Sequence, residues 1–276
     1  MLWLVLSFVC SFGFGQLFKW SQRRGYHAPT VVSVNYLTLA SAAGLYHIFF
    51  GQTPLNLAAG RIGLYTGIAF IVSMLVMTRA LERVEVGAVL TGFRLAILVP
   101  VGFGLYLWGE TIGFRQAAGL AMAGSALLLM TWRNGVERRF GVALWWVLAV
   151  FFFQGLSQVF LRAVHYLGLD GFHQSFLLAT SFTAGMLGSL FVLGCRRWPR
   201  PKELAMGMGI GLYNLLALTV ILIALAKVPG TVYFPAHGCA VVILDNLAAH
   251  FFWREPVSKA ALWGAILGAV AMILVL

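Results

Sequence analysis

The sequence predicts an all-α integral membrane protein whose ten transmembrane helices form two inverted five-helix repeats. Three observations carry this prediction. Hydrophobic residues make up 61% of the 276 residues and charged residues only 10%, which leaves too little polar surface for a water-soluble domain. Apolar segments about as long as the ~20 residues that a helix needs to cross a hydrocarbon core follow one another along the chain. Finally, one pattern of residues recurs 145 positions apart.

The apolar segments are separated only by short links, so we expect a single membrane domain with no separate soluble part. The first segment has no basic residue before its apolar run and no small-x-small cleavage site, and we therefore interpret it as a helix and not as a signal peptide. The ten predicted spans are 1–20, 30–50, 62–81, 86–108, 111–132, 141–164, 174–194, 204–226, 231–253 and 256–276.

The clearest block of the repeat lies late in each half-chain and reads "LWGETIGFRQAAG" and "FWREPVSKAALWG". In it, Trp108, Glu110 and Gly119 recur as Trp253, Glu255 and Gly264. Two further blocks keep the same order at offsets of 142 and 144, which indicates a repeat of the whole half-chain. We therefore divide the chain into repeats 1–135 and 136–276. Because each repeat has an odd number of spans, the second begins on the opposite side of the membrane, and the halves are inverted. The recurring pairs in the two further blocks are Gly13/Gly155, Gln16/Gln158, Phe18/Phe160, Gly63/Gly207, Gly67/Gly211 and Ala80/Ala224, with Val5/Val147, Leu6/Leu148, Leu81/Leu225 and Val84/Val228.

The net charge of +11 is spread over the links and forms no basic stripe of the kind that binds nucleic acid. Lys and Arg favour alternate links: 14 lie in or beside the odd-numbered links and 4 in or beside the even-numbered ones. Short cytoplasmic loops collect Lys and Arg, so the odd links are predicted to face the cytoplasm. Ten spans then place both termini on the other side.

These features carry a family resemblance. The two Glu-turn-helix segments, together with "GFGQLFKW" and "APTVVSVNYLTLA", which hold Lys19 and Pro29, resemble the EamA-type drug/metabolite transporter superfamily over the full chain. The resemblance implies a secondary carrier for small metabolites or drugs, with a central cavity between the halves and termini in the cytosol. The chain departs from the family where an Arg early in the second helix is replaced by Asn35 or Tyr36, and where Pro100 lies later in the fourth helix.

Polar side chains inside the spans are the candidates for substrate or ion binding, because ionisable groups in hydrocarbon usually face a cavity or a partner. Arg94 and Asp245 both lie roughly 12 Å from odd-numbered links at ~1.5 Å per residue, so they share a depth and are predicted to meet. The pair has either a binding role or a purely structural one. The candidates are Arg94, Asp245, His237, Gln16, Gln158 and Asn214.

For three of these candidates a structural role is an equal contender. His237 is either a proton carrier or a hydrogen-bonded structural histidine. Gln16 and Gln158 occupy equivalent places in the two repeats, where amides either face a common cavity or join neighbouring helices. Glu110 and Glu255 are predicted to cap the fifth and tenth spans at their N-terminal ends, with a direct transport role as the less favoured alternative.

Several functions are not expected. The sequence has no GxxxxGK[ST], HExxH or GxSxG motif, so neither ATP-driven pumping nor hydrolysis is predicted, and the chain is not expected to be an enzyme. No cofactor or metal centre is expected. The predicted partners are a small-molecule solute, a coupling proton or other ion, and the lipid bilayer of a bacterial inner membrane. The alternative is an integral-membrane enzyme or a non-transporting membrane assembly protein.

The charge count and the family resemblance predict opposite orientations, and a reporter distinguishes them. A reporter that is active only in the cytoplasm is fused after Leu276. If the distribution of Lys and Arg sets the orientation, the fusion is silent. The same reporter placed in the link 198–202 serves as the control and is then active. The reverse pattern would support the orientation that the family implies.

Overall fold

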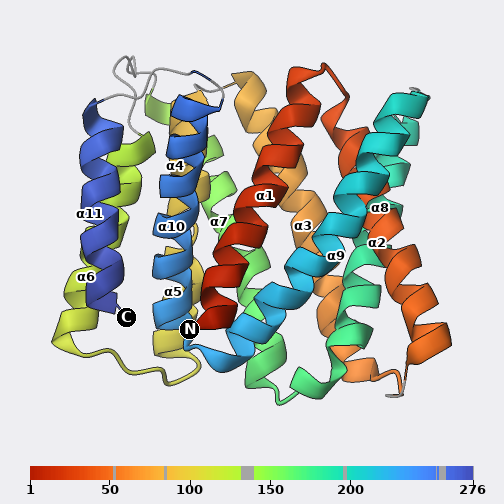
Figure 1. Cartoon of the computed structure of the whole chain (residues 1–276), viewed down its shortest axis with the longest axis horizontal. Coiled ribbons are helices and arrows are strands. Elements are labelled where there is room, and N and C mark those ends of the chain that lie inside the picture. The colour runs from red at the N-terminus through yellow and green to blue at the C-terminus, as the bar shows by residue number, and fades with distance from the viewer. Residues whose placement is uncertain are drawn as a thin grey trace. The chain divides into compact units, whose positions relative to one another are not determined.

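The computed structural model describes residues 1–51, 54–83, 86–131, 140–194, 198–252, 254 and 259–275. All regular structure within these ranges is helical (Figure 1). The elements are α1 (Leu2–Arg23), α2 (Ala28–Phe50), α3 (Leu57–Arg83), α4 (Val86–Leu95), α5 (Leu98–Tyr106), α6 (Phe114–Thr131), α7 (Phe140–Tyr166), the 3-10 helix η1 (Asp170–Phe172), α8 (His173–Gly194), α9 (Pro201–Lys227), α10 (Gly230–Phe251) and α11 (Lys259–Val275).

Helix length and composition support a multi-pass membrane protein. Among the described residues, α1, α2, α3, α7, α8, α9 and α10 are long and apolar enough to cross a membrane. Three further apolar helical segments are shorter, namely Gly92–Tyr106, Phe114–Leu129 and Leu262–Val275. Each predicted span therefore contains helix among its described residues, but the count of ten membrane crossings stays a prediction.

The fourth predicted span is not one continuous helix. It breaks at Ala96 and Ile97, between α4 and α5. Pro100 explains the break, since proline has no N–H to donate to the carbonyl group of Ala96 and its ring crowds that carbonyl. The N–H of Val99 donates to the Ala96 carbonyl instead, at 3.1 Å. The sequence contained this signal in Pro100, but the apolar run across it suggested continuity.

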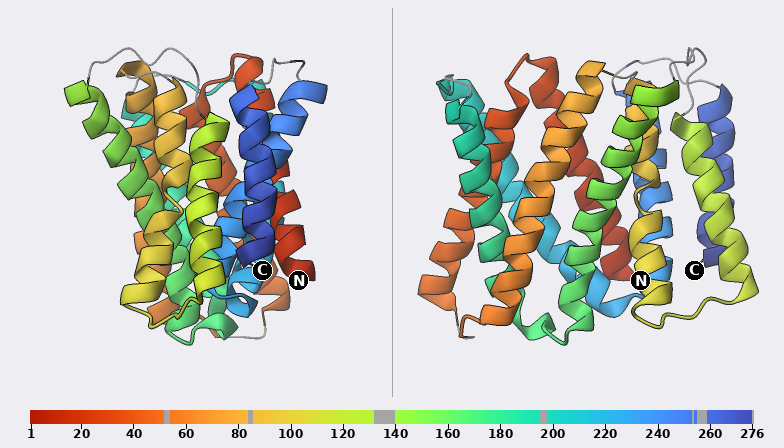
Figure 2. Two further views of the ribbon diagram at one scale, coloured as in Figure 1. Left: turned by 90° about the vertical axis from the view of Figure 1, so that its left-hand side faces the viewer. Right: turned by 180° about the vertical axis from the view of Figure 1, so that it is seen from behind.

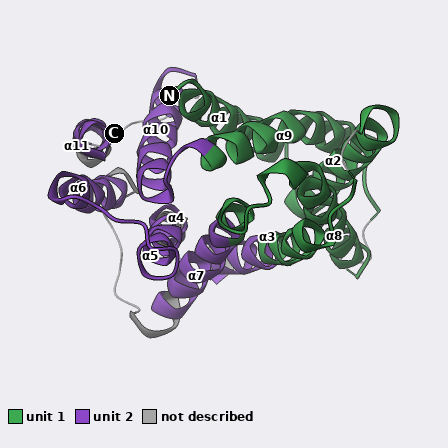
Figure 3. Cartoon of the chain, turned by 90° about the horizontal axis from the view of Figure 1, so that it is seen from below, with its two compact units in different colours: residues 1–71, 160–226 green, residues 72–159, 227–276 purple. Residues whose placement is uncertain are grey.

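The chain forms two compact units, and neither of them is a sequence half (Figure 3). Unit 1 comprises residues 1–71 and 160–226, and unit 2 comprises 72–159 and 227–276. Each unit therefore combines residues of both predicted repeats, and boundaries between the units fall within α3 and within α7.

In unit 1, α2 packs along α8 in the antiparallel direction. Leu37 lies against Gly185, and Ser33, one turn earlier in α2, lies against Gly188, which is later in α8. Because lipid tails are as apolar as the side chains of these helices, close packing through small residues is what holds the helices together in hydrocarbon.

Four glycines make two equivalent contacts in unit 1. Gly63 and Gly67 of α3 lie against residues 176–184 of α8, whereas Gly207 and Gly211 of α9 lie against residues 31–38 of α2. The contacts agree residue by residue: a Cβ at the first glycine would meet the carbonyl of Phe176 in one case and that of Val31 in the other, 145 positions apart. Helices α3 and α9 thus approach their neighbours through the same glycines.

A buried carboxylate joins two helix starts in unit 1. Glu203, which is fully buried, accepts the backbone N–H of His27 at 3.0 Å through Oε1. Its Oε2 accepts the N–H of Arg200 at 3.0 Å. Because the first N–H groups of a helix lack partners within the helix, this single side chain satisfies donors at the starts of both α2 and α9.

Unit 2 is built around α6, α10 and α11. Helices α6 and α11 run side by side and antiparallel (Figure 2), with Gly119 against Val275 and Ala123 against Ala271. Helix α10 packs against α5, α6 and α11, and α4 packs against α6. Leu127 and Val242 form the buried contact that joins α6 to α10. This arrangement brings α4 and α10 into one unit and thereby positions the candidate site.

The glycine contacts predict where an added methyl group destabilises the protein. Gly63→Ala and Gly207→Ala place a Cβ within 3.0 Å of a backbone carbonyl or a neighbouring side chain, and each is expected to cost about 1–3 kcal/mol of stability. The measurement is the midpoint of thermal unfolding in detergent.

Matched controls exist one turn or less away in the same helices. A Cβ at Gly60 of α3 or Gly209 of α9 meets nothing within 4 Å. Gly60→Ala and Gly209→Ala are therefore expected to be neutral or to stabilise by up to about 1 kcal/mol through helix propensity. Equal destabilisation by all four variants would contradict the close-contact explanation.

Candidate functional site

Arg94 and Asp245 form an ion pair within unit 2. Arg94 is the penultimate residue of α4, and its Nη2 lies 2.7 Å from Oδ2 of Asp245 on α10. The side chains are 28% and 25% exposed, so the pair is neither sealed in the core nor fully solvated. The prediction that these residues meet is confirmed. A role in ion or substrate binding stays a prediction.

Further groups stabilise the guanidinium group of Arg94. It lies 5.7 Å from the centre of the Phe93 ring, which favours a cation over its face. Arg94 also lies in the last turn of α4, where the carbonyl end of the helix dipole favours positive charge. The local fold therefore supports a permanent positive charge at this position.

His237 lies two turns before Asp245 on α10, within electrostatic range of Arg94. Its ring stacks on that of Tyr233, with centroids 5.2 Å apart and an interplanar angle of 22°. The histidine predicted as a candidate thus belongs to the same unit as the ion pair. Its aromatic contact is consistent with the structural role, and the proton-carrier role stays a prediction.

The break between α4 and α5 sets the position of Arg94, because it ends α4 one residue after this side chain. Gly155 of α7 packs directly on the break, where a Cβ would lie 2.9 Å from the carbonyl oxygen of Ala96 and would overlap Val99. A broken helix leaves carbonyl groups without the regular intrahelical partners, and such breaks are common at binding sites in membrane carriers.

Sequence reasoning missed Asn246, which follows Asp245 on α10. Its Nδ2 is buried and meets no hydrogen-bond acceptor among the residues that the structure describes. A buried amide donor without an acceptor is suited to a ligand or water that brings its own oxygen atom. No sequence signal distinguishes this asparagine from others, because only packing shows that its donor lacks an acceptor.

The remaining predicted site residues lie elsewhere. Asn214 of α9 is buried in unit 1 and donates through Nδ2 to Oδ1 of Asn35 on α2, at 3.1 Å. This bond joins two helices, as interhelical amides do in membranes, and a binding role for Asn214 stays a prediction. Gln16 belongs to unit 1 and Gln158 to unit 2, and a shared cavity for these two stays a prediction.

Glu110 is a helix cap, but for a different helix from the one predicted. Helix α6 begins only at Phe114, and the carboxylate of Glu110 instead accepts two N–H groups at the start of α10. Oε1 accepts from Gly230 at 2.9 Å and Oε2 from Thr231 at 2.8 Å. The expectation of a cap on the fifth span is therefore corrected, since a turn separates Glu110 from α6 and points it towards α10.

The turn before Glu110 has a counterpart in the second repeat. Gly109 has a φ of 65°, a left-handed conformation that glycine adopts without strain. Arg254, which is 145 positions later, has a φ of 54° and is the one non-glycine residue with positive φ among those described. Glu255 and Trp253, the partners of Glu110 and Trp108 in the repeat, lie outside the described residues.

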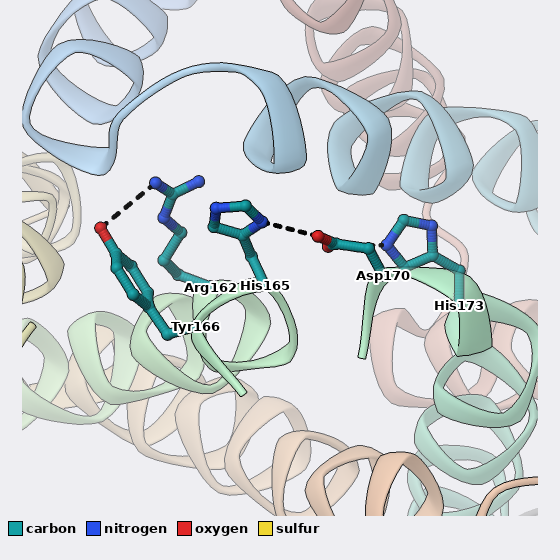
Figure 4. A network of polar contacts seen from close by, with 5 residues as sticks. All are labelled: Arg162, His165, Tyr166, Asp170 and His173. Atoms are coloured by element: carbon teal, nitrogen blue, oxygen red, sulfur yellow. Dashed lines mark hydrogen bonds and ion pairs between the residues drawn. The ribbon is translucent and has the colours of Figure 1, made fainter. Parts of the chain in front are cut away.

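A second polar cluster lies at the junction of α7 and α8 in unit 1 (Figure 4). Asp170 of η1 lies between two histidines: Nδ1 of His165 is 2.8 Å from its Oδ2, and Nε2 of His173 is 3.6 Å from its Oδ1. One turn before His165, the buried Arg162 donates to the hydroxyl group of Tyr166 at 3.3 Å.

Sequence reasoning did not select this cluster, although histidines flanking an aspartate were visible in "HYLGLDGFH". The described residues contain no group of three His, Cys, Asp or Glu side chains placed to hold a metal ion. The contacts connect the end of α7, η1 and the start of α8, so they stabilise the turn between these helices.

Comparison with known proteins supports the fold and gives no information on function. No protein-family profile and no curated protein matches the chain. A solved structure described only as "Crystal structure of protein" is similar, with a TM-score of 0.78 over 99% of this chain and 94% of that chain. The two sequences are 16% identical, so the similarity shows the fold alone.

The Glu110 cap predicts a loss of stability. Glu110→Ala leaves two N–H groups at the start of α10 without their carboxylate and is expected to cost about 1–2 kcal/mol. Glu110→Gln, whose single amide oxygen still accepts, should lose less. Thr111→Ala, at the exposed neighbouring position, is the control. If thermal unfolding is the same for Glu110→Ala and the control, the cap does not stabilise α10.

Proposed function

We propose that the protein is a secondary transporter of a small metabolite or drug-like solute. It works by alternating access across the interface of two inverted five-helix repeats. Its binding site includes Arg94 and Asp245. The observation that carries this proposal is the ion pair between these residues, which is partly exposed and lies beside a broken helix in an otherwise apolar protein.

Repeat-related contacts support the inverted arrangement. Helices α2 and α8 correspond in the two repeats and pack antiparallel, as do α6 and α11. The glycine contacts of α3 with α8 match those of α9 with α2, residue by residue, when the two repeats are interchanged. Gly109 and Arg254 share one unusual backbone conformation. Corresponding helices that run in opposite directions are expected from an axis in the membrane plane.

The free-energy cost of placing charges inside a membrane supports a functional role for the ion pair. A charge at the centre of a bilayer costs about 2.5–3.5 kcal/mol on insertion scales, and charged residues inside spans usually mark substrate or ion pathways. A pair of apolar residues would fill the same space without this cost, since replacing buried ion pairs by apolar groups is often neutral or stabilising. Asp245 is therefore proposed to take part in binding an ion or the substrate.

The alternative from another class is an integral-membrane enzyme or a non-transporting assembly protein of the bacterial inner membrane. An enzyme is expected to gather ionisable residues near one face, and the cluster around Asp170 is the observation that favours it. An uptake screen in proteoliposomes distinguishes the classes. If amino acids, nucleosides, sugars and cationic dyes all fail to move under any ion gradient while a lipid-modifying activity appears, the transporter proposal is lost.

Charge removal at the ion pair is expected to impair transport. Asp245→Asn and Arg94→Gln each leave one charge without its partner, and breaking a buried pair this way is costly, about 3–5 kcal/mol where burial is complete. A loss of 1.4 kcal/mol of binding free energy lowers a binding constant tenfold. We therefore expect each single variant to reduce transport at least about tenfold.

The double variant separates two roles of the pair. Uptake by Asp245→Asn, Arg94→Gln and the double variant is compared at equal abundance in the membrane. A purely structural pair predicts that removing both charges restores transport, whereas a binding role predicts that the double variant stays inactive. Undiminished transport by Asp245→Asn would remove Asp245 from the mechanism.

A further inference from the structure

We infer that one end of unit 1 binds the headgroup of an anionic phospholipid. This surface, called the basic end below, consists of the end of α1, the link from α1 to α2 and the start of α9. Its exposed cationic side chains are Arg23, Arg24, Arg200 and Lys202. The inference goes beyond the proposed function, because the basic end belongs to unit 1 and the ion pair of the candidate site belongs to unit 2.

The sequence concentrates positive charge in the two segments that form the basic end. Residues 19–27 hold three Lys or Arg, and residues 195–203 hold four, of which Arg196 and Arg197 lie outside the described residues. The two segments together contain one acidic residue, Glu203. Both segments follow odd-numbered predicted spans, so they face the same side of the membrane in either orientation of the chain.

The tertiary structure brings the two segments together through Glu203. Its fully buried carboxylate group accepts the N–H of His27 and the N–H of Arg200, each at 3.0 Å. The two segments are therefore joined through one carboxylate group and two hydrogen bonds, and the end of α1 lies at the same end of the unit as the starts of α2 and α9 (Figure 1). The acidic side chain is turned inward, whereas the basic side chains stay at the surface.

The cations at the end of α1 are held in place by the fold. Helix α1 ends at Arg23, and Gly25 reverses the chain with a φ of 71°. The guanidinium group of Arg24 lies over the ring of Trp20, with Cζ 4.2 Å from the ring centre. A guanidinium group that is stacked in this way loses little conformational freedom when it binds an anion.

The cations at the start of α9 have no comparable explanation in the helix itself. Lys202 lies in the first turn of α9, where the helix dipole disfavours positive charge. Arg200 immediately precedes the helix, and both side chains are exposed. An anion from outside the chain is therefore the group that stabilises positive charge at this position.

The surroundings of the basic end identify this anion as a lipid headgroup. Helix ends of a membrane protein lie at the depth of the phosphate groups, and clusters of about four to eight Lys or Arg beside a span attract anionic lipids. Trp20 is 40% exposed and Trp198 is 84% exposed. Tryptophan is enriched at this depth, because its ring is apolar while its N–H is polar. The partner that fits is a phospholipid with a net negative charge.

The test measures which phospholipid binds the full chain in a neutral detergent. The probes are phosphatidylglycerol and phosphatidylcholine with identical acyl chains, titrated separately, and the constant for the first bound lipid is read by native mass spectrometry. Because both lipids carry a phosphate group and only phosphatidylglycerol has a net charge, we expect phosphatidylglycerol to bind at least about tenfold tighter.

Variants locate the bound lipid. Arg24→Gln and Lys202→Gln, one from each segment, are each expected to weaken the first phosphatidylglycerol about fivefold and to leave phosphatidylcholine unchanged. Arg24→Lys keeps the charge and should stay within about twofold of the wild type. Arg61→Gln, which removes an exposed cation from α3 in the same unit, is the control. Thermal unfolding without added lipid checks that every variant is folded.

The possible results either support the surface or remove it. Equal binding of the two lipids, or equal weakening by Arg61→Gln and by Arg24→Gln, would overturn the inference. If the two segments bound separate lipids, neither Arg24→Gln nor Lys202→Gln would weaken the first lipid by more than about twofold, and the joint surface would be lost. Displacement by millimolar inorganic phosphate, but not by chloride at the same ionic strength, would show a site for soluble phosphate instead of lipid.

Discussion

The structure depends on one constraint: inside a hydrocarbon solvent, no water replaces a missing hydrogen bond or counter-charge. Several of the described polar groups meet this constraint through contacts between helices. Glu110 accepts two N–H groups from α10, Glu203 accepts N–H groups at the starts of α2 and α9, and Asn35 and Asn214 satisfy one another. These bonds also determine which helix ends meet, so the polar groups specify the packing while the apolar surface alone does not.

The same solvent changes what holds the apolar helices together. Lipid tails are as apolar as leucine side chains, so association depends on close packing and not on the exclusion of water. Glycines supply the close approach at repeated positions of α3 and α9, and small residues join α6 to α11. The contact of α3 with α8 and that of α9 with α2 therefore correspond residue by residue, and both are present in unit 1.

The ion pair is the exception that suggests a function. The carboxylates of Glu110 and Glu203 each accept two backbone N–H groups, whereas Arg94 and Asp245 pair with one another and remain partly exposed. A carboxylate that caps a helix has a structural reason to be in the membrane. The ion pair joins α4 to α10 and remains partly exposed, which is why it is the candidate site of the proposed function.

The sequence by itself determined the helical class, the extent of nearly every apolar segment and the meeting of Arg94 with Asp245, because length, composition and depth are local or one-dimensional properties. It also contained Pro100, the cause of the break in the fourth segment. Only the tertiary structure decided that Glu110 caps α10, that Asn214 bonds to Asn35, that His165, Asp170 and His173 gather, and that each compact unit combines both halves. The cluster around Asp170 is local in sequence, but the contacts of Glu110 and Asn214 join residues 120 and 179 positions apart, so only packing in three dimensions brings these together.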